Sequence, residues 1–265
     1  MASYEELIQA QAGWRYEPGE QLLAGKNIVV TGAGDGIGAA FAKTTACYGA
    51  NVILVGRTRE KLEVVFDWIE QETQTKPVIV PCDLEHLDAN NVEALADNIE
   101  QTYGVLHGLV HSASLLGAKT PIAHYPIAEW QRVMQVNANA PFILTQGLFD
   151  LLDRSEDAKV LFISSSVGRQ GRAYWGAYSA SKFALEGLSQ IFADETETAG
   201  NILVYSVNPG ATRTAMRKAA YPMEDPTSVP LPESHMDMFL YLLDSPSYAT
   251  GSQLDARSWS HPKNL

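Results

Sequence analysis

Short apolar runs alternate along this chain with longer segments in which apolar residues recur every three or four positions. The short runs are rich in β-branched residues and almost continuously hydrophobic, as strands covered on both faces must be. Strands are predicted at residues 27–30, 52–55, 78–80, 109–110, 160–163, 202–207 and 253–255. Helices are predicted between and after them, at residues 36–49, 58–74, 88–103, 127–153, 176–198 and 236–243.

Strands that alternate with helices predict right-handed crossovers and an open parallel sheet. The helix expected at 58–74 shows the helical pattern most clearly, because Leu62, Val65 and Ile69 share one face with Phe66. We therefore expect an α/β fold in which a doubly wound parallel sheet of about seven strands carries helices on both faces.

The 265 residues fit one large domain, and nothing in their pattern divides them. Residues 1–24 are polar and lack strand signals, so we expect an N-terminal extension followed by one domain at 25–265. Residues 215–232 are rich in Pro, Met and acidic side chains and predict a mobile loop.

The net charge of −12 argues against nucleic acid or an anionic membrane surface as a partner. No apolar run approaches the roughly 20 residues that span a bilayer. Glu5 and Glu6 stand where a secretory signal carries basic residues. Cys47 and Cys82 are interpreted as reduced thiols, and their spacing suggests no metal site. We expect a cytoplasmic protein without a metal.

A glycine-rich segment, Thr31 to Gly38, lies between the first predicted strand and the first predicted helix. Glycines let a pyrophosphate approach the backbone, and the following helix offers unpaired N–H groups and the positive end of its dipole. An ordinary glycine-rich turn is the alternative. The position of the segment in the first strand–turn–helix unit favours a dinucleotide site.

The end of the second strand indicates which dinucleotide binds. Folds that prefer NAD place a carboxylate there, whereas this chain has Arg57, which suits a 2′-phosphate. We expect NADP(H) rather than NAD(H), although Arg57 and Arg59 are also ordinary residues for a helix start, and Asp35 disfavours a nearby phosphate. Asp83 is interpreted either as a contact of the adenine amino group or as a helix cap.

Tyr178 and Lys182 are the residues most indicative of chemistry. Four residues apart, they share one face of a predicted helix, so the lysine charge favours the ionised phenol. Ser165, thirteen residues upstream, is placed to hold a carbonyl or alcohol oxygen. The structural alternative is a polar strand end at Ser165 and an aromatic cluster of Tyr174, Trp175 and Tyr178.

Together these motifs resemble the classical short-chain dehydrogenase/reductase family over roughly residues 25–255, and most closely a bacterial subgroup of YciK-like oxidoreductases. The resemblance implies a Rossmann fold and the catalytic residues Asn137, Ser165, Tyr178 and Lys182. The expected cofactor-binding residues are Gly32, Gly34, Asp35, Gly36, Ile37, Gly38, Arg57, Asp83, Leu84, Ser112, Ala113, Tyr178, Lys182, Pro209, Gly210, Thr212 and Thr214.

One segment departs from the family pattern. Where the family carries Asn-Asn-Ala-Gly, this chain has His111-Ser112-Ala113-Ser114. The second Asn commonly ties its strand to the neighbouring strands, so we expect a weakened cofactor fit or altered stability here. His111 is predicted to be a packed core histidine and not a catalytic base.

The resemblance implies interconversion of a carbonyl and a secondary alcohol by hydride transfer, with Tyr178 as general acid/base. The alternative is a nucleotide-binding protein of the same fold with a regulatory or scaffolding role and little turnover. A small carbonyl or alcohol is the expected partner, in a pocket lined by Arg169, Gln170, Arg172, Tyr174, Trp175 and the 215–232 loop. A homodimer or homotetramer is expected by analogy with the family.

Overall fold

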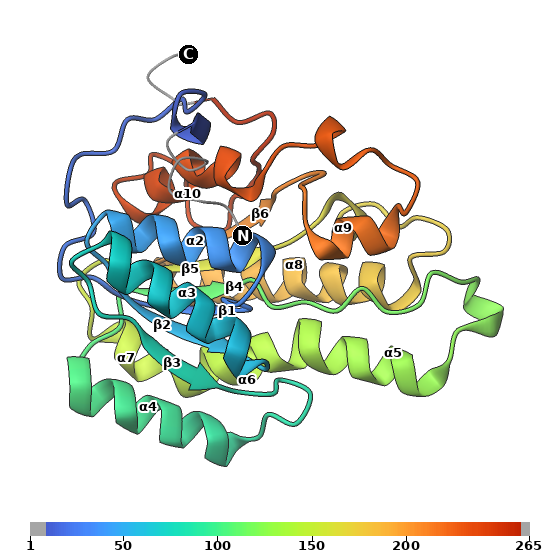
Figure 1. The fold of residues 1–265 in the computed structure, drawn as a ribbon. Helices are drawn as coiled ribbons and strands as arrows, with labels where there is room; N and C mark the ends of the chain where they lie inside the picture. Colours follow the sequence, from blue (N-terminus) through green and yellow to red (C-terminus); the bar gives the residue numbers. More distant parts are fainter. Residues whose placement is uncertain (1–8, 261–265) are drawn as a thin grey trace.

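The computed structural model describes residues 9–260, which form a parallel sheet of seven strands with helices on both faces (Figure 1). The strands are β1 (Asn27–Thr31), β2 (Asn51–Gly56), β3 (Val78–Pro81), β4 (Gly108–His111), β5 (Ala158–Ile163), β6 (Ile202–Asn208) and β7 (Gln253–Asp255). Their order in the sheet is β3-β2-β1-β4-β5-β6-β7, and every neighbouring pair is parallel. The predicted doubly wound α/β fold is therefore confirmed.

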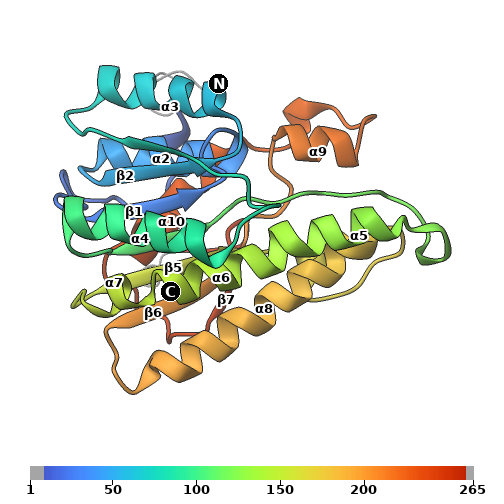
Figure 2. The same cartoon turned by 90° about the horizontal axis from the view of Figure 1, so that it is seen from below.

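Two helical layers bury the two faces of this sheet, one above it and one below it in Figure 1, and Figure 2 views the molecule from the lower side. One layer contains α2 (Gly36–Cys47), α3 (Arg59–Glu72) and α10 (Met236–Leu243), and the other contains α4 (Ala89–Tyr103), α6 (Ala140–Gly147) and α8 (Gly176–Glu197). Along β1, Ile28 and Val30 pack into the first core, whereas Val29 packs into the second. Both faces of the strand are buried, which explains its continuous hydrophobicity.

The helix predicted over 127–153 is divided in the structure. It comprises α5 (Ile127–Met134), a π-helical turn (Gln135–Asn139), α6 and α7 (Phe149–Asp153). The hydrophobic pattern does not reveal the interruption, because it runs through the turn without a break. Single π-helical turns inside α-helices are frequent at functional sites, and this one contains Asn137.

The 215–232 segment is more regular than the predicted loop. It begins with α9 (Ala215–Ala220), where the Thr214 hydroxyl caps the helix by accepting a hydrogen bond from Arg217 N at 3.1 Å. Arg217 pairs with Glu224, and Arg213 N donates to Pro230 O at 2.8 Å. The prediction of a loop was wrong for its first six residues, since the cap and the ion pair stabilise a helix there.

Residues 9–24 pack against the body of the protein. Trp14 Nε1 donates to Glu233 O at 3.0 Å, and Tyr16 OH donates to Asp244 at 2.7 Å. Leu23 is buried in the core beside α2 and α10. The described part of the predicted extension is thus fastened to η5 (Pro232–His235) and α10. No helix among residues 9–260 combines the length and apolar character needed to cross a membrane.

Candidate active site

A cleft of about 340 Å³ opens at the carboxyl ends of the central strands, around the point where β1 has β2 on one side and β4 on the other. Open parallel sheets place ligands at this switch point. Thirteen of the expected cofactor-binding residues line this cleft: Gly32, Asp35, Gly36, Ile37, Arg57, Asp83, Leu84, Ser112, Ala113, Tyr178, Lys182, Pro209 and Thr214.

Four of the expected residues, Gly34, Gly38, Gly210 and Thr212, do not line the cleft. Gly38 allows α2 to pack closely on the preceding turn, because a Cβ there would collide with Gly32 O. Gly34 lies against Lys61, and Thr212 is buried. In this structure these residues therefore take part in packing and do not form the wall of the cavity.

The turn after β1 requires glycine where it meets the end of β4. Gly32 has φ of +68°, and a Cβ there would lie 2.8 Å from the Ala113 Cα. Asp35 caps α2 by accepting a hydrogen bond from Gly36 N at 2.8 Å, and its other oxygen lies 2.6 Å from Lys61 Nζ. Because Lys61 compensates this carboxylate, Asp35 opposes a bound phosphate less than the sequence suggested.

The end of β2 leaves Arg57 available to a ligand. Arg57 is exposed on the cleft wall and makes no side-chain hydrogen bond or ion pair with residues 9–260. Arg59 instead pairs with Glu63 at 2.8 Å. Asp83 lines the cleft and also stabilises a local turn, since it accepts a hydrogen bond from Glu85 N at 3.1 Å. Both interpretations of Asp83 from the sequence are compatible with this geometry.

Thr31 joins the end of β1 to the end of β4. Its buried hydroxyl accepts hydrogen bonds from Ser112 N and Ala113 N, both at 3.1 Å, and donates to Val110 O at 3.2 Å. The end of β4 is therefore joined to β1 despite the altered His111–Ser114 segment.

We expect Thr31→Val to lower the free energy of unfolding by about 1–3 kcal/mol, because the Ala113 N–H loses its partner in a buried site. Urea unfolding measures this loss. Thr44→Val is the matched control, since Thr44 is equally buried and its hydroxyl has no partner among the described residues. Equal losses in the two variants would contradict a specific role for the Thr31 hydroxyl.

His111 is a core residue, as predicted. Its ring stacks on Phe162 with centroids 4.8 Å apart, and its Nε2 lies 2.9 Å from the Thr145 hydroxyl. Burial, together with the charge of Lys182, lowers the pKa of His111 to about 3. The imidazole is therefore neutral at physiological pH and does not line the cleft.

α8 brings Tyr178 and Lys182 to the cleft, with both side chains buried. Lys182 Nζ donates to Ile163 O at 2.7 Å and lies 5.6 Å from the centre of the Tyr178 ring. Burial raises the pKa of Tyr178 to about 12, although a hydrogen bond with Ser165 opposes this. Burial lowers the pKa of Lys182 to about 8, against the effect of Glu186. The lysine can thus change charge close to neutral pH.

The amide of Asn137 is held by the backbone of the β4–α5 connection. Its Oδ1 accepts from Leu115 N at 2.7 Å, and its Nδ2 donates to Leu115 O at 2.9 Å and to the Ser181 hydroxyl at 3.0 Å. Asn137 itself does not line the cleft, but Leu115 and its neighbour Val136 do. Its side chain therefore fixes the cleft wall to α8.

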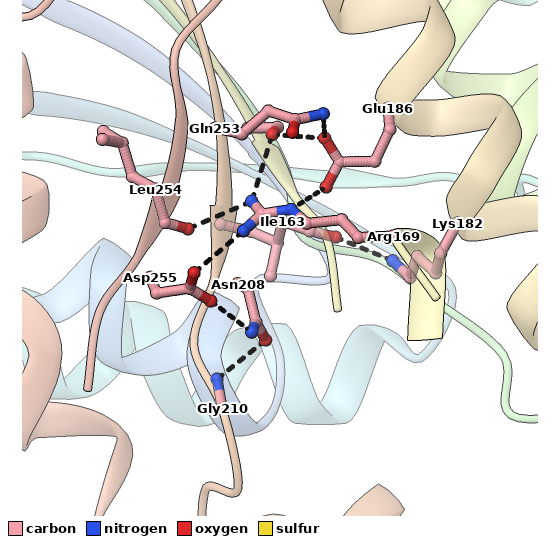
Figure 3. Close-up of polar contacts among 10 residues, drawn as sticks. Ile163, Arg169, Lys182, Glu186, Asn208, Gly210, Gln253, Leu254 and Asp255 are labelled. Carbon is pink, nitrogen blue, oxygen red and sulfur yellow. Dashed lines mark hydrogen bonds and ion pairs between the residues drawn. The ribbon is translucent and has the colours of Figure 1, made fainter. Parts of the chain in front are cut away.

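Five individual residues were expected to line the substrate pocket, and none of them lines this cleft: Arg169, Gln170, Arg172, Tyr174 and Trp175. Arg169 turns away from the cleft and pairs with Glu186 at 2.9 Å and Asp255 at 3.0 Å, as Figure 3 shows. The prediction that Arg169 lines the pocket was therefore wrong, because a buried carboxylate on α8 binds it. Trp175 does not line this cleft either, but it lies beside it, with its ring 5.7 Å from that of Tyr178 and 6.0 Å from that of Tyr221.

Sequence reasoning missed two features of the site. Lys119 lies 4.8 Å from the Trp175 ring and 4.5 Å from the Tyr221 ring, and it donates to Ala220 O at 2.8 Å. It joins the β4–α5 connection to α9, and no motif marked it. The buried hydroxyls of Ser114 and Ser164 also lack partners among the described residues, and both serines line the cleft.

Comparisons with known proteins agree with this geometry. The family model for short chain dehydrogenases matches residues 26–225. The uncharacterized oxidoreductase YciK of Escherichia coli is 46% identical over 248 residues, which cover 93% of this chain and 98% of that protein.

Solved structures show the same likeness. A short-chain dehydrogenase from Shigella flexneri, complexed with NADP, matches with a TM-score of 0.87 and 46% identity, covering 90% of this chain and 100% of its own. One from Escherichia coli, complexed with NADPH, matches with a TM-score of 0.88 and 46% identity, covering 91% and 100%. The chain therefore belongs to the short-chain dehydrogenase family, within which it is a YciK-like oxidoreductase.

Proposed function

We propose that this protein is an NADP(H)-dependent oxidoreductase that interconverts a carbonyl and a secondary alcohol. One observation supports this most strongly: Tyr178 and Lys182 share one cleft with the glycine-rich turn and Arg57. The turn fits a dinucleotide, because it keeps Cβ atoms out of the space beside Ala113. The complexes of the two similar structures with NADP and NADPH support the same cofactor.

The bound cofactor supplies or accepts the hydride. In the proposed reduction, Ser165 and Tyr178 donate hydrogen bonds to the substrate carbonyl oxygen, and Tyr178 then transfers its proton to that oxygen. Lys182 stabilises the resulting tyrosinate by its charge and holds the ribose hydroxyls. Asn137, held by Leu115 and Ser181, keeps the cleft wall at Leu115 joined to α8.

The alternative of a nucleotide-binding protein with little turnover depended on the altered His111–Ser114 segment. Because the Thr31 hydroxyl holds the end of β4 to β1, with Ser112 and Ala113 on the cleft wall, that segment gives the alternative little support. A cytoplasmic homodimer or homotetramer acting on a small carbonyl or alcohol stays part of this proposal, by analogy with the family.

We expect Arg57→Ala to weaken NADPH binding by about 10- to 100-fold and to leave NADH binding nearly unchanged. The reason is the loss of a charge-assisted hydrogen bond to the 2′-phosphate, worth about 1.5–3 kcal/mol. Isothermal titration calorimetry with both nucleotides measures the two affinities. Arg59→Ala is the control. It removes the same charge from a side chain two residues away that does not line the cleft. Equal weakening of NADPH and NADH by Arg57→Ala would refute the assignment of the 2′-phosphate contact.

A further inference from the structure

A second cavity, about 190 Å³ in volume, lies outside the cleft. Its walls come from three segments distant in sequence: Gly13–Arg15, the stretch from Pro230 to Asp237, and Ala256–Trp259. Figure 1 shows the first of these, in dark blue, beside α10. The polar groups on its walls belong to Arg15, Ser234, His235, Asp237 and Arg257, together with Trp259.

Two of these residues carry positive charge that the described chain does not neutralise. Arg15 and Arg257 are both exposed, and neither side chain makes an ion pair or a hydrogen bond with residues 9–260. Other arginines of the protein, such as Arg154 and Arg169, pair with carboxylates. Two unpaired guanidinium groups on one cavity are unexpected in a chain of net charge −12.

The one carboxylate that residues 9–260 place on the cavity wall is already engaged. Asp237 is buried at the start of α10, where its Oδ2 accepts a hydrogen bond from Arg15 N at 2.7 Å. The positive end of the α10 dipole also favours a negative charge at this position. One carboxylate against two guanidinium groups leaves the cavity with an excess positive charge.

A buried histidine with an unused nitrogen completes the cavity. His235 is 6% exposed, and its Nε2 has no hydrogen-bond partner among the described residues. Burial, together with the charges of Arg257 and Arg15, lowers the pKa of His235 to about 4, so both guanidinium groups act on the ring. A neutral imidazole can present Nε2–H as a donor. Leaving such a group unpaired costs about 1–3 kcal/mol, which a ligand that accepts this hydrogen bond recovers.

We propose that this cavity binds a small anion through phosphate- or carboxylate-type oxygens, held by Arg15, Arg257 and the Nε2–H of His235. Guanidinium groups form paired, charge-assisted hydrogen bonds with both kinds of oxygen. The site is independent of the proposed oxidoreductase activity, because none of its three ligand-binding residues lines the cleft.

The bound anion joins segments that border the cleft. Pro230 lies on the cavity wall, and its carbonyl accepts from Arg213 N at 2.8 Å, which fastens the end of the 215–232 segment. The Arg257 side chain packs on Gly210, next to Pro209 on the cleft wall. The anion therefore stabilises the N-terminal segment, the 215–232 segment and the C-terminal segment against one another, and should raise the melting temperature.

The test follows the His235 ring by proton–carbon NMR while phosphate or acetate is added at constant ionic strength, made up with sodium chloride. The full-length protein carries Arg57→Gln, which removes the competing anion site in the cleft. We expect a saturable shift of the His235 resonance with at least one of the two oxyanions. The oxyanion that binds more tightly identifies which type of oxygen the site prefers.

Arg15→Gln and Arg257→Gln should each weaken this binding by about tenfold, the effect of losing one charge-assisted contact. Arg154→Gln is the matched control, because Arg154 is an exposed arginine that pairs with Glu100 away from the cavity. The Arg154→Gln variant should bind the oxyanion with unchanged affinity. The resonances of the other histidines report that each variant is folded. A His235 resonance that moves with neither oxyanion overturns the proposal. So does equal weakening in all three variants, which would indicate general charge screening.

Discussion

Tyr178→Phe should lower kcat by about 10²–10⁴, because a positioned general acid contributes this much to the rate. The phenylalanine ring keeps the packing of Tyr178 against Trp175, so NADPH affinity and stability should change little. The measurement is NADPH oxidation with a carbonyl compound found by screening sugar-like ketones, acyl thioesters and hydrophobic ketones.

Tyr103→Phe is the matched control for this experiment. Tyr103 lies on α4, does not line the cleft, and its hydroxyl has no hydrogen bond with the described residues, so the variant should retain full activity. Unchanged turnover in Tyr178→Phe would remove Tyr178 from the reaction. A loss of activity accompanied by a comparable loss of NADPH affinity would indicate damage to the cleft instead.

Arg169→Met should lower the free energy of unfolding by about 3–5 kcal/mol, the usual cost of breaking a buried ion pair by removing one partner. The Glu186 side chain is only 4% exposed and would keep its hydrogen bonds from Ser206 at 2.6 Å and Gln253 at 2.8 Å, but it would lose its ion-pair partner. Figure 3 shows how this network joins α8 to β6 and β7. Urea unfolding measures the loss.

Two further variants separate this effect from the mere removal of an arginine. Arg154→Met breaks an exposed pair with Glu100, which solvent screens, and should lower the free energy of unfolding much less than Arg169→Met does. The double variant of Arg169→Met and Glu186→Met removes both charges and should recover much of the loss. If Arg169→Met costs no more than Arg154→Met, the buried network does not stabilise α8.

The sequence allowed the sheet to be predicted because each strand carries its own evidence. Val29 and Val30 face opposite cores, so both faces of the strand must be apolar. This produces the apolar runs from which the strands were predicted. The glycine-rich turn and the spacing of Tyr178 and Lys182 are equally local. Each lies within one element, so the sequence alone places it at the end of a strand or on the face of a helix.

The parts that could not be predicted depend on contacts between distant segments. Arg169 lies next to the catalytic segment, yet its partner Asp255 is 86 residues away. Lys119 reaches Ala220 across 101 residues, and Thr31 binds Ala113 at the altered β4 end across 82. The π-helical turn at Asn137 does not interrupt the hydrophobic pattern. Periodicity and spacing carry no information about such pairings.

The most direct test of the account is the binding of NADPH and NADH to the unmodified protein, followed by nucleotide fluorescence and by tryptophan emission. Trp175 lies beside Tyr178 and should report occupation of the cleft. The account predicts saturable NADPH binding and distinctly weaker NADH binding. Failure to bind either nucleotide would contradict it, because the glycine-rich turn, Arg57 and Lys182 would then line a cleft that does not hold the proposed cofactor.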